Sequence, residues 1–391
     1  MPTIIALCSY LAPLLHPTRA AFMCAITITL FTLAANDVLK RVLQAALWLT
    51  LGVSVYERGG LIMKELFTDE GYHQRDGYSY LFQEGSEVLW NIFLLLEDFV
   101  CVIAWMYYSR SFFRRPEVTG SQYHQPFADW MRRWVIDDVA NYFSFRIIAE
   151  PKAKNFLGKA KKKKHILLLH PHGIFPGTAM WAPHTTEWMN KIGSATTVTT
   201  HAASILFNGP FQRDLIMGLG GRVVTRTSIV RSLDEGNCAV IVPGGQAEMI
   251  LSHRSNTEMH LVTHHVGFIR LAITERAPLV PTISFNEANK LDNIHCHSIQ
   301  KAFLKRVGFG FPVLPHGRWY LPIPINQPIT LVIGDPIPPP PYDGNGERGD
   351  VELEELVRAM KDLYFKKLRE LFEKHKAECG YPEMKLFYHD K

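Results

Sequence analysis

The stretch His165-Ile166-Leu167-Leu168-Leu169-His170-Pro171-His172-Gly173 decides the fold that the sequence predicts. Its four consecutive aliphatic residues, Ile166–Leu169, are typical of a short strand that is buried on both faces, as in a parallel sheet. Pro171 has a restricted φ and favours an extended conformation at His170, whereas Gly173 allows a sharp turn. We therefore predict a buried strand that ends in a constrained loop carrying two imidazoles.

A second strand-and-loop unit, Cys238–Glu248, ends in a carboxylate. Its aliphatic residues are followed by Gly244 and Gly245, which let the backbone approach a ligand closely. In open parallel sheets, ligands bind beyond the carboxyl ends of the strands. His172 and Glu248 are both expected at such ends, where an imidazole and a carboxylate can act together as a general base.

After residue 150, short aliphatic runs alternate with helical patterns, as an α/β fold requires. Strands are expected at residues 166–169, 197–200, 221–224, 239–242, 279–285 and 329–333, and helices at residues 228–235 and 268–274. Apolar residues at helical spacing also predict an amphipathic helix over Glu352–Lys376. The predicted fold class is α/β, with a mostly parallel sheet flanked by helices.

Apolar stretches distinguish the first 115 residues from the rest. They cover residues 21–35, 42–56 and 88–108, and each is broken or flanked by charge. The first two are shorter than the roughly 20 residues that a spanning helix needs. The third contains Glu97 and Asp98, each of which costs roughly 2.5 to 3.5 kcal/mol at the bilayer centre. This stretch is predicted to be a hairpin with the two acids near its tip or, alternatively, an interfacial segment.

Basic residues directly follow the third apolar stretch. Arg110, Arg114 and Arg115 favour the cytoplasmic side for the chain that comes after them. We predict an N-terminal membrane-anchoring, helical region over residues 1–115, in preference to a soluble helical cap, and a cytosol-facing α/β domain over residues 116–391.

The composition indicates which kinds of molecule the chain binds and which compartment it faces. A net charge of +5 and a pI near 8.8 suit an anionic membrane surface or a phosphate-bearing ligand, but they are too weakly basic to indicate nucleic-acid binding. The six cysteines show no paired spacing, and several lie in apolar runs. This usage predicts reduced thiols rather than a disulfide framework, in keeping with a domain that faces the cytosol.

The number of histidines raises the question of a metal site. The candidates are His170, His172, His260, His264, His265, His295 and His297. A zinc-dependent membrane hydrolase would use three such ligands and a bound water. Only His260 and His264 are spaced to share one face of a helix, and neither belongs to a recognisable zinc-protease motif. We therefore expect no metal site.

Five blocks occur in a recognisable order within residues 100–385. They are His170–Gly173, Pro243–Glu248, Gly267–Glu287, His316–Arg318 and Pro328–Ile337. In this order they resemble the type-2 diacylglycerol and monoacylglycerol acyltransferases. The chain departs from that family where it has His265-Val266 in place of a basic pair, Asn286 in place of a glycine and Ser144 in place of a proline. These differences touch the ligand-binding blocks and leave the acceptor open.

The resemblance implies a glycerolipid-acyltransferase-like fold and an endoplasmic reticulum membrane enzyme, with lipid droplets as a second location. Such an enzyme moves a fatty acyl group from coenzyme A to the free hydroxyl of diacylglycerol and makes triacylglycerol. Acyl-coenzyme A and neutral lipids are then the expected substrates, with no cofactor and with a homo-oligomeric state left open. The alternatives are transfer to monoacylglycerol or to a long-chain alcohol, and a non-catalytic lipid-binding protein, against which the intact His172 and Glu248 argue.

The expected catalytic residues are His172, Glu248 and His170. A neutral imidazole can take the proton of the acceptor hydroxyl, an effect of about 10² to 10⁴ in rate. His172 is the expected base, and Glu248 is expected to accept a hydrogen bond from its other ring nitrogen. His170 is expected to orient the loop or to assist His172, and the alternative that it is the base stays open.

Six further residues are expected to bind substrate. They are Gly173, Arg226, Gly244, Gly245, Arg270 and Arg318. Main-chain N–H groups at the glycines can stabilise the oxyanion that forms when the thioester is attacked. The arginines are candidates for anionic groups, and the resemblance assigns Arg226 to a phosphate of coenzyme A.

Overall fold

The computed structural model describes residues 113–158, 164–193, 197–209, 211–294, 314–344, 346 and 349–390, with scattered positions between 89 and 111. The chain divides into two compact units, residues 1–115 with 208–213 and residues 116–207 with 214–391. Among the described residues, no helix combines the length and the apolar character needed to cross a membrane. The apolar stretches 21–35 and 42–56 and the pair Glu97-Asp98 lie outside the described residues.

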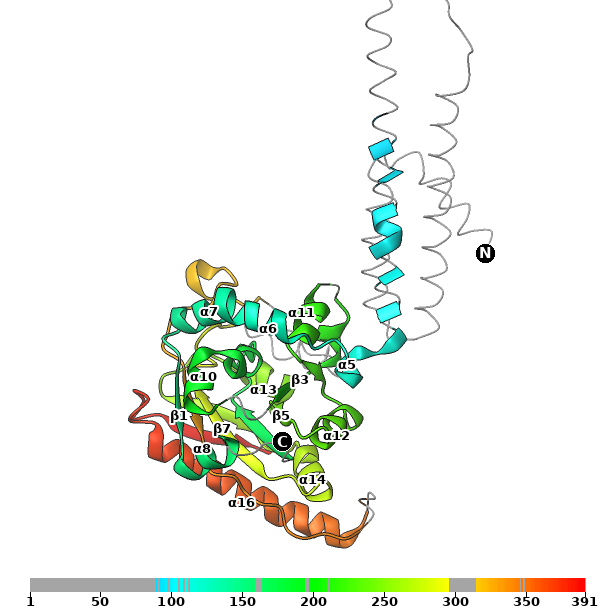
Figure 1. Cartoon of the computed structure of the whole chain (residues 1–391). Coiled ribbons are helices and arrows are strands. Elements are labelled where there is room, and N and C mark those ends of the chain that lie inside the picture. Colours follow the sequence, from blue (N-terminus) through cyan, green and yellow to red (C-terminus); the bar gives the residue numbers. More distant parts are fainter. Residues whose placement is uncertain are drawn as a thin grey trace, which may run out of the picture. The chain divides into compact units, whose positions relative to one another are not determined.

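A seven-stranded sheet forms the centre of the larger unit, with the strand order β1-β8-β7-β2-β5-β3-β4 (Figure 1). Its strands are β1 (Arg146–Ala149), β2 (His165–His170), β3 (Val198–Ala202), β4 (Arg222–Val223), β5 (Cys238–Ile241), β7 (Leu279–Phe285) and β8 (Thr330–Ile333). Neighbouring strands pair in parallel except β7 and β8, which are antiparallel. The predicted mostly parallel sheet is confirmed, although β8 and β1 run against the other strands.

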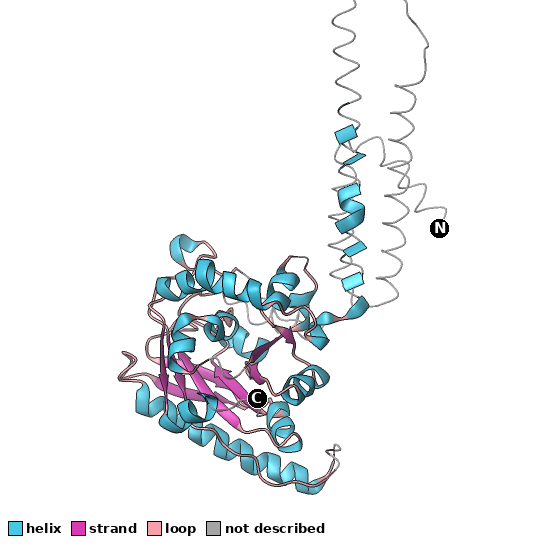
Figure 2. Ribbon diagram, viewed as in Figure 1, coloured by secondary structure: helices cyan, strands magenta, loops and turns pink. Residues whose placement is uncertain are grey.

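Helices cover both faces of this sheet (Figure 2). One face packs against α8 (Pro151–Gly158), α9 (Gly177–Trp181) and α10 (Thr186–Lys191), and the other against α12 (Arg226–Asp234), α14 (Gly267–Thr274) and α16 (Val351–His375). The chain also forms α5 (Pro116–Thr119), α6 (Gln125–Met131), α7 (Asp137–Tyr142), α11 (Gln212–Gly218) and α13 (Gly245–Leu251). A separate two-stranded parallel sheet joins β6 (Glu258–Val262) to β9 (Lys385–His389).

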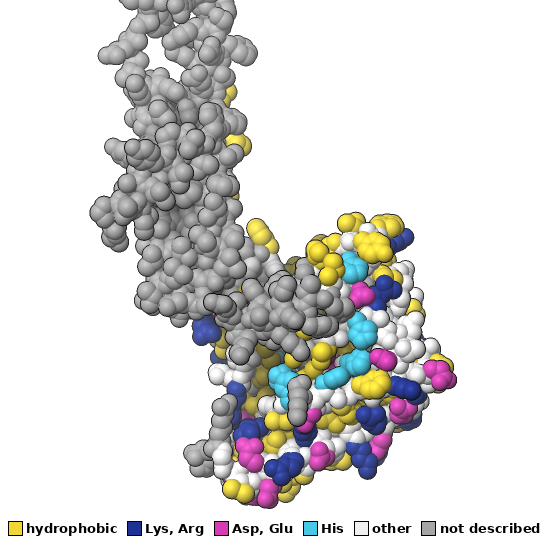
Figure 3. All heavy atoms as spheres, turned by 180° about the vertical axis from the view of Figure 1, so that it is seen from behind, with side chains coloured by type: hydrophobic (Ala, Val, Ile, Leu, Met, Phe, Trp, Pro, Cys, Tyr) yellow, Lys and Arg dark blue, Asp and Glu magenta, His cyan; other side chains and the backbone are white. Residues whose placement is uncertain are grey.

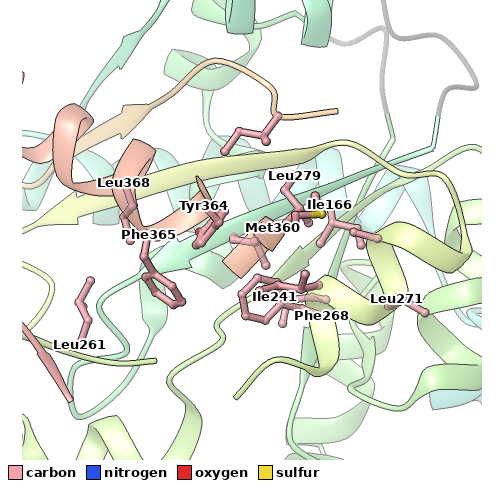
Figure 4. Packing of buried hydrophobic residues seen from close by; sticks show 14 of the residues in the cluster. Ile166, Ile241, Leu261, Phe268, Leu271, Leu279, Met360, Tyr364, Phe365 and Leu368 are labelled. Atoms are coloured by element: carbon pink, nitrogen blue, oxygen red, sulfur yellow. The ribbon is translucent and has the colours of Figure 1, made fainter. Parts of the chain in front are cut away.

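The side chains of β2 explain why the sheet has helices on both faces. Ile166 and Leu168 pack with α12, α14 and α16, whereas Leu167 and Leu169 pack with α8, α9 and α10. Successive side chains of a strand point to opposite faces, so burial on both faces requires an uninterrupted aliphatic run. Figure 4 shows the first of these clusters, in which Ile166 lies among side chains from the surrounding helices and strands.

Most of the predicted elements are confirmed. The expected strands correspond to β2, β3, β4, β5, β7 and β8, and the expected helices to α12, α14 and α16. The sequence pattern does not predict β1, β6 and β9, because their apolar runs are only two or three residues long and are flanked or interrupted by charged and polar residues. His260 lies in the strand β6, so its four-residue spacing from His264 does not place the two on one face of a helix. The described cysteines, Cys101, Cys238 and Cys379, are free thiols, as expected.

Candidate active site

Three neighbouring parallel strands bring the candidate active site together. β7, β2 and β5 lie side by side, with β2 in the middle. Because the three strands run in the same direction, the segments that follow them meet at one edge of the sheet. These segments contain His170–Gly173, Gly244–Glu248 and Asn286–Glu287. The prediction that His172 and Glu248 lie at the ends of strands on one edge is confirmed.

His170 is the last residue of β2 and is fully buried. Its Nε2 lies 3.0 Å from the hydroxyl of Tyr364 in α16, and its ring also contacts Phe365. Burial lowers the pKa of His170 to about 3, so the ring is neutral at physiological pH. These are the contacts of a residue that packs β2 against α16 and orients the loop that follows.

His172 is only partly buried, and its own loop orients its ring. Its Nδ1 lies 2.9 Å from the carbonyl oxygen of Gly173. Since a carbonyl oxygen can only accept, Nδ1 carries the proton and the lone pair of the neutral ring is on Nε2. Desolvation lowers the pKa of His172, and the bond to Gly173 and the charge of Glu287 act in the opposite direction. The ring is therefore neutral at pH 7, with Nε2 as its basic atom.

Glu248 is buried, and its carboxylate binds the main chain rather than an imidazole. Oε2 accepts from the backbone N–H of His172 at 2.6 Å, and Oε1 accepts from the backbone N–H of Val262 in β6 at 2.9 Å. The predicted hydrogen bond between Glu248 and a ring nitrogen of His172 is therefore wrong, because Nδ1 faces Gly173. Burial raises the pKa of Glu248 to about 7, although both N–H groups favour the charged form.

Glycines allow the loops of the site to approach one another. Gly173 has a φ of +63°, and a Cβ at this position would stand 3.1 Å from the main-chain oxygen of Glu287. A Cβ at Gly244 would overlap the carboxylate of Glu248. Gly245, which begins α13, also has a positive φ, of +52°. Gly173 and Gly244 thus lie close to other groups of the site. Contact of Gly173, Gly244 and Gly245 with substrate stays a prediction.

A second buried carboxylate, Glu287, belongs to the site although the sequence analysis assigns it no role. It accepts from Lys290 Nζ at 2.5 Å, from Ser284 Oγ at 3.1 Å, and from both the backbone N–H and the hydroxyl of Thr178. Lys290 is itself buried, so the two charges form a buried, fully hydrogen-bonded pair. The signal in the sequence is an acid just after the fully buried strand β7.

A small pocket of about 30 Å³ lies beside the loop after β2. Its walls include Pro171, Gly173, Glu248, Ser284 and Asn289. The volume suffices for about two water molecules. The pocket is therefore a small recess next to the loop, and it is too small for an acyl chain.

Asn286 lies where the family pattern has a glycine, and the backbone shows why the exchange is tolerated. Its φ is +72°, in the left-handed region that glycine adopts most easily and that asparagine tolerates best among other residues. The side chain is also held, because Nδ2 donates to the Pro328 oxygen at 2.7 Å and Oδ1 accepts from Asn289 Nδ2 at 2.9 Å. The exchange keeps the backbone conformation of the loop.

The three candidate arginines are not brought together with His172. Arg226 is exposed at the first position of α12, beside an open hollow that Arg231 also lines. The guanidinium of Arg270 forms an ion pair of 2.8 Å with Glu354, which joins α14 to α16. Arg318 is exposed and lies over the ring of Trp319, 4.4 Å from its centroid. Of the three, Arg226 alone presents an exposed guanidinium at the start of an α-helix, where anions bind favourably.

Known proteins resemble the chain over most of this unit. Residues 92–388 match a family model described as diacylglycerol acyltransferase. The mouse protein named diacylglycerol O-acyltransferase 2-like protein 6 is 31% identical over 273 residues, which are 64% of this chain and 76% of that protein. Acyl-CoA wax alcohol acyltransferase 2 of mouse is 28% identical over 302 residues, 73% of this chain and 83% of its own. Rat diacylglycerol O-acyltransferase 2 is 30% identical over 278 residues, 66% and 67% of the two chains. No solved structure matches the chain.

Gly173→Ala should destabilise the protein more than Gly193→Ala. Both glycines have positive φ values, of +63° and +100°, but nothing lies within 4 Å of a Cβ at Gly193. Gly193→Ala should therefore cost only the backbone strain of about 1 to 2 kcal/mol. Gly173→Ala should cost about 1 to 3 kcal/mol more, since the main chain at Glu287 must move. Equal shifts of the thermal unfolding midpoint in the two variants would contradict this account.

The stability of the wild type relative to Glu248→Gln should fall as the pH rises from about 5 to 8. The folded state raises the pKa of Glu248 from 4.5 to about 7, so its contribution is fully present below pH 4.5 and is lost as the pH passes 7. His172 titrates in both proteins, so the difference between them isolates Glu248. Unfolding midpoints measured in parallel at each pH test this, and a constant difference across the range would contradict the shift.

Proposed function

The chain belongs to the diacylglycerol acyltransferase family, and we propose that it transfers a fatty acyl group from coenzyme A to the free hydroxyl of diacylglycerol. Acyl transfer is the reaction of the family, whereas the acceptor and the residues that act on it are the proposal. One observation carries it: the neutral ring of His172 is oriented through Nδ1, which leaves its basic Nε2 for a substrate proton.

His172 is proposed as the general base in preference to His170. The Nε2 of His170 already contacts the hydroxyl of Tyr364, and the ring is fully buried. Its pKa of about 3 would make it a weak base even if a substrate reached it. His172 is partly exposed at the edge of the sheet where ligands bind in this class of fold.

In the proposed step, the oxygen of the acceptor hydroxyl attacks the carbonyl carbon of the thioester while Nε2 of His172 takes the hydroxyl proton. The C–S bond then breaks, and the imidazolium returns the proton to the sulfur of coenzyme A. General-base help of this kind contributes about 10² to 10⁴ in rate. No side chain is acylated, and the step requires neither a cofactor nor a metal.

Two carboxylates support the base in different ways. Glu248 positions it, since its bond to the His172 N–H holds the main chain of the loop. The charge of Glu287 favours the imidazolium that forms during the reaction, and its ion-pair partner Lys290 opposes this effect. Because the His172 N–H is taken by Glu248, the proposed donors to the oxyanion are the N–H groups of Gly173, Gly244 and Gly245.

A long-chain alcohol is the proposed alternative to diacylglycerol as acceptor. The alignment with the mouse acyl-CoA wax alcohol acyltransferase 2 covers a larger share of this chain, 73%, than that with rat diacylglycerol O-acyltransferase 2, which covers 66%. The similarity to a protein named for a wax alcohol acceptor supports a long-chain alcohol as the alternative acceptor. The same His172 chemistry serves either hydroxyl, as it would that of monoacylglycerol.

Apolar side chains support the proposal that residues 1–115 anchor the enzyme in a membrane. The described positions between 89 and 107 are helical, and most of the large apolar side chains among them are exposed: Leu89, Ile92, Phe93, Leu96, Phe99, Val100, Ile103, Met106 and Tyr107. An exposed apolar surface of this kind is typical of membrane contact. We propose that the enzyme lies in the endoplasmic reticulum membrane, facing the cytosol, with lipid droplets as a second location.

His172→Ala should lower acyl transfer by about 10² to 10⁴ without changing the amount of protein in membranes. The assay follows labelled acyl-coenzyme A in membranes, with diacylglycerol, monoacylglycerol and hexadecanol supplied in parallel. His264→Ala is the control, because it removes an exposed histidine elsewhere. Near-normal turnover of His172→Ala would contradict the proposed base. If the wild type labels only wax ester, or only diacylglycerol, then the acceptor is a long-chain alcohol or monoacylglycerol instead.

Arg226→Ala should raise the KM for acyl-coenzyme A roughly tenfold, the equivalent of about 1.4 kcal/mol, with little change in kcat. The exposed guanidinium of Arg226 at the start of α12 is proposed to bind a phosphate of coenzyme A. Arg231→Ala is the matched control, since Arg231 lies on the same helix but pairs with Glu235 at 3.2 Å. Equal increases of the KM in the two variants would indicate a general effect of positive charge and would contradict phosphate binding by Arg226.

A further inference from the structure

Two histidines and a glutamate come together at the start of β6, outside the residues proposed for acyl transfer. They are His253, in the segment between α13 and β6, and Glu258 and His260, in β6 itself. One ligand atom from each residue lies within 4.8 Å of the others. Figure 3 shows exposed histidine side chains gathered on one face of the molecule, close to acidic side chains.

His260 is held in a fixed orientation by its neighbours. Its ring stacks on Phe387 of β9, with 5.1 Å between the centroids and 17° between the planes. Its Nδ1 lies 2.9 Å from Nε2 of His389, and its Nε2 lies 3.1 Å from Oε2 of Glu258. One ring nitrogen thus faces another histidine, while the other faces the carboxylate. This is the arrangement of a metal-binding histidine whose second nitrogen is oriented by a further polar group.

We propose that His253, Glu258 and His260 bind a divalent transition metal ion, with Zn²⁺ as the best fit. Two imidazoles and one carboxylate are a common set of three protein ligands for Zn²⁺, and the fourth position is then available to water. Tetrahedral ligands at about 2.0 to 2.2 Å from Zn²⁺ lie roughly 3.3 Å apart. The side chain of Glu258 is 46% exposed, so it can move the remaining distance by rotation.

The position of the site suggests what the ion does. His253 follows α13, which carries Glu248, and His260 lies in β6, whose Val262 donates to the same Glu248. A bound ion would therefore brace the two elements that hold this carboxylate. His253, Glu258 and His260 also line the small pocket that Gly173 and Glu248 line, so the fourth ligand of the ion faces that pocket.

The binding test uses the full chain, purified in detergent with a tag that contains no histidine and stripped of metal by a chelator. Zn²⁺ is titrated in competition with a coloured chelator, and Co²⁺ is used to report the geometry through its visible absorption. We expect one tight site with the strong visible bands of tetrahedral Co²⁺. Zn²⁺ should also raise the thermal unfolding midpoint, because it binds the folded chain.

Three variants test the assigned ligands. His260→Ala should weaken Zn²⁺ binding at least about 100-fold, and His389→Ala about 10- to 100-fold, because it removes only the orienting partner. Glu258→Gln should also weaken binding, and it tests the site even if His260→Ala does not fold, since Glu258 is exposed. In both Glu258→Gln and His260→Ala, the rise in midpoint with Zn²⁺ should disappear.

The control is the double variant His264→Ala/His265→Ala, which removes two neighbouring histidines whose rings lie 4.1 Å apart outside the cluster. It should bind Zn²⁺ as the wild type does. The proposal is overturned if this control loses the site, if His260→Ala and Glu258→Gln both bind as tightly as the wild type, or if the wild type binds no Zn²⁺ tightly.

Discussion

The buried carboxylate of Glu248 is the constraint on which the geometry of the site depends. It joins three segments that are distant in sequence: the loop after β2, the helix α13 and the strand β6. Each of its oxygens satisfies one main-chain N–H, and a buried N–H without a partner costs about 1 to 3 kcal/mol. The position of His172 is thus set through its own backbone, which leaves the imidazole available for chemistry.

The two buried acids of the site are stabilised in different ways, and this difference matters for the base. Glu287 is paired with the buried Lys290 and accepts from hydroxyl groups as well, so its charge is compensated. Glu248 accepts from two neutral N–H groups without a cation, and burial raises its pKa to about 7. His172 is therefore close to Glu287, whose charge is compensated. Its backbone N–H also donates to Glu248, which is partly protonated near neutral pH.

Histidines of similar sequence context have different environments in this fold. His170 and His172 are two residues apart, yet α16 encloses the first and the second is partly exposed. His260 is four residues from His264, a spacing that suits one face of a helix, whereas the strand β6 directs it toward His253 and Glu258. Burial and the neighbouring segment decide what each imidazole can do, and neither follows from the spacing of histidines.

The sequence by itself determined the α/β class, the strand β2 and the common edge at which His172 and Glu248 lie. These follow from local patterns, because an uninterrupted aliphatic run requires burial on both faces and parallel strands align their carboxyl ends. Only the tertiary structure decided that Glu248 binds the backbone of His172, that Glu287 completes the site, that β8 runs against β7 and that His253 meets His260. The physical reason is that hydrogen bonds are selective over a few tenths of an ångström. Their partners come from segments whose relative placement is set by packing across the whole core.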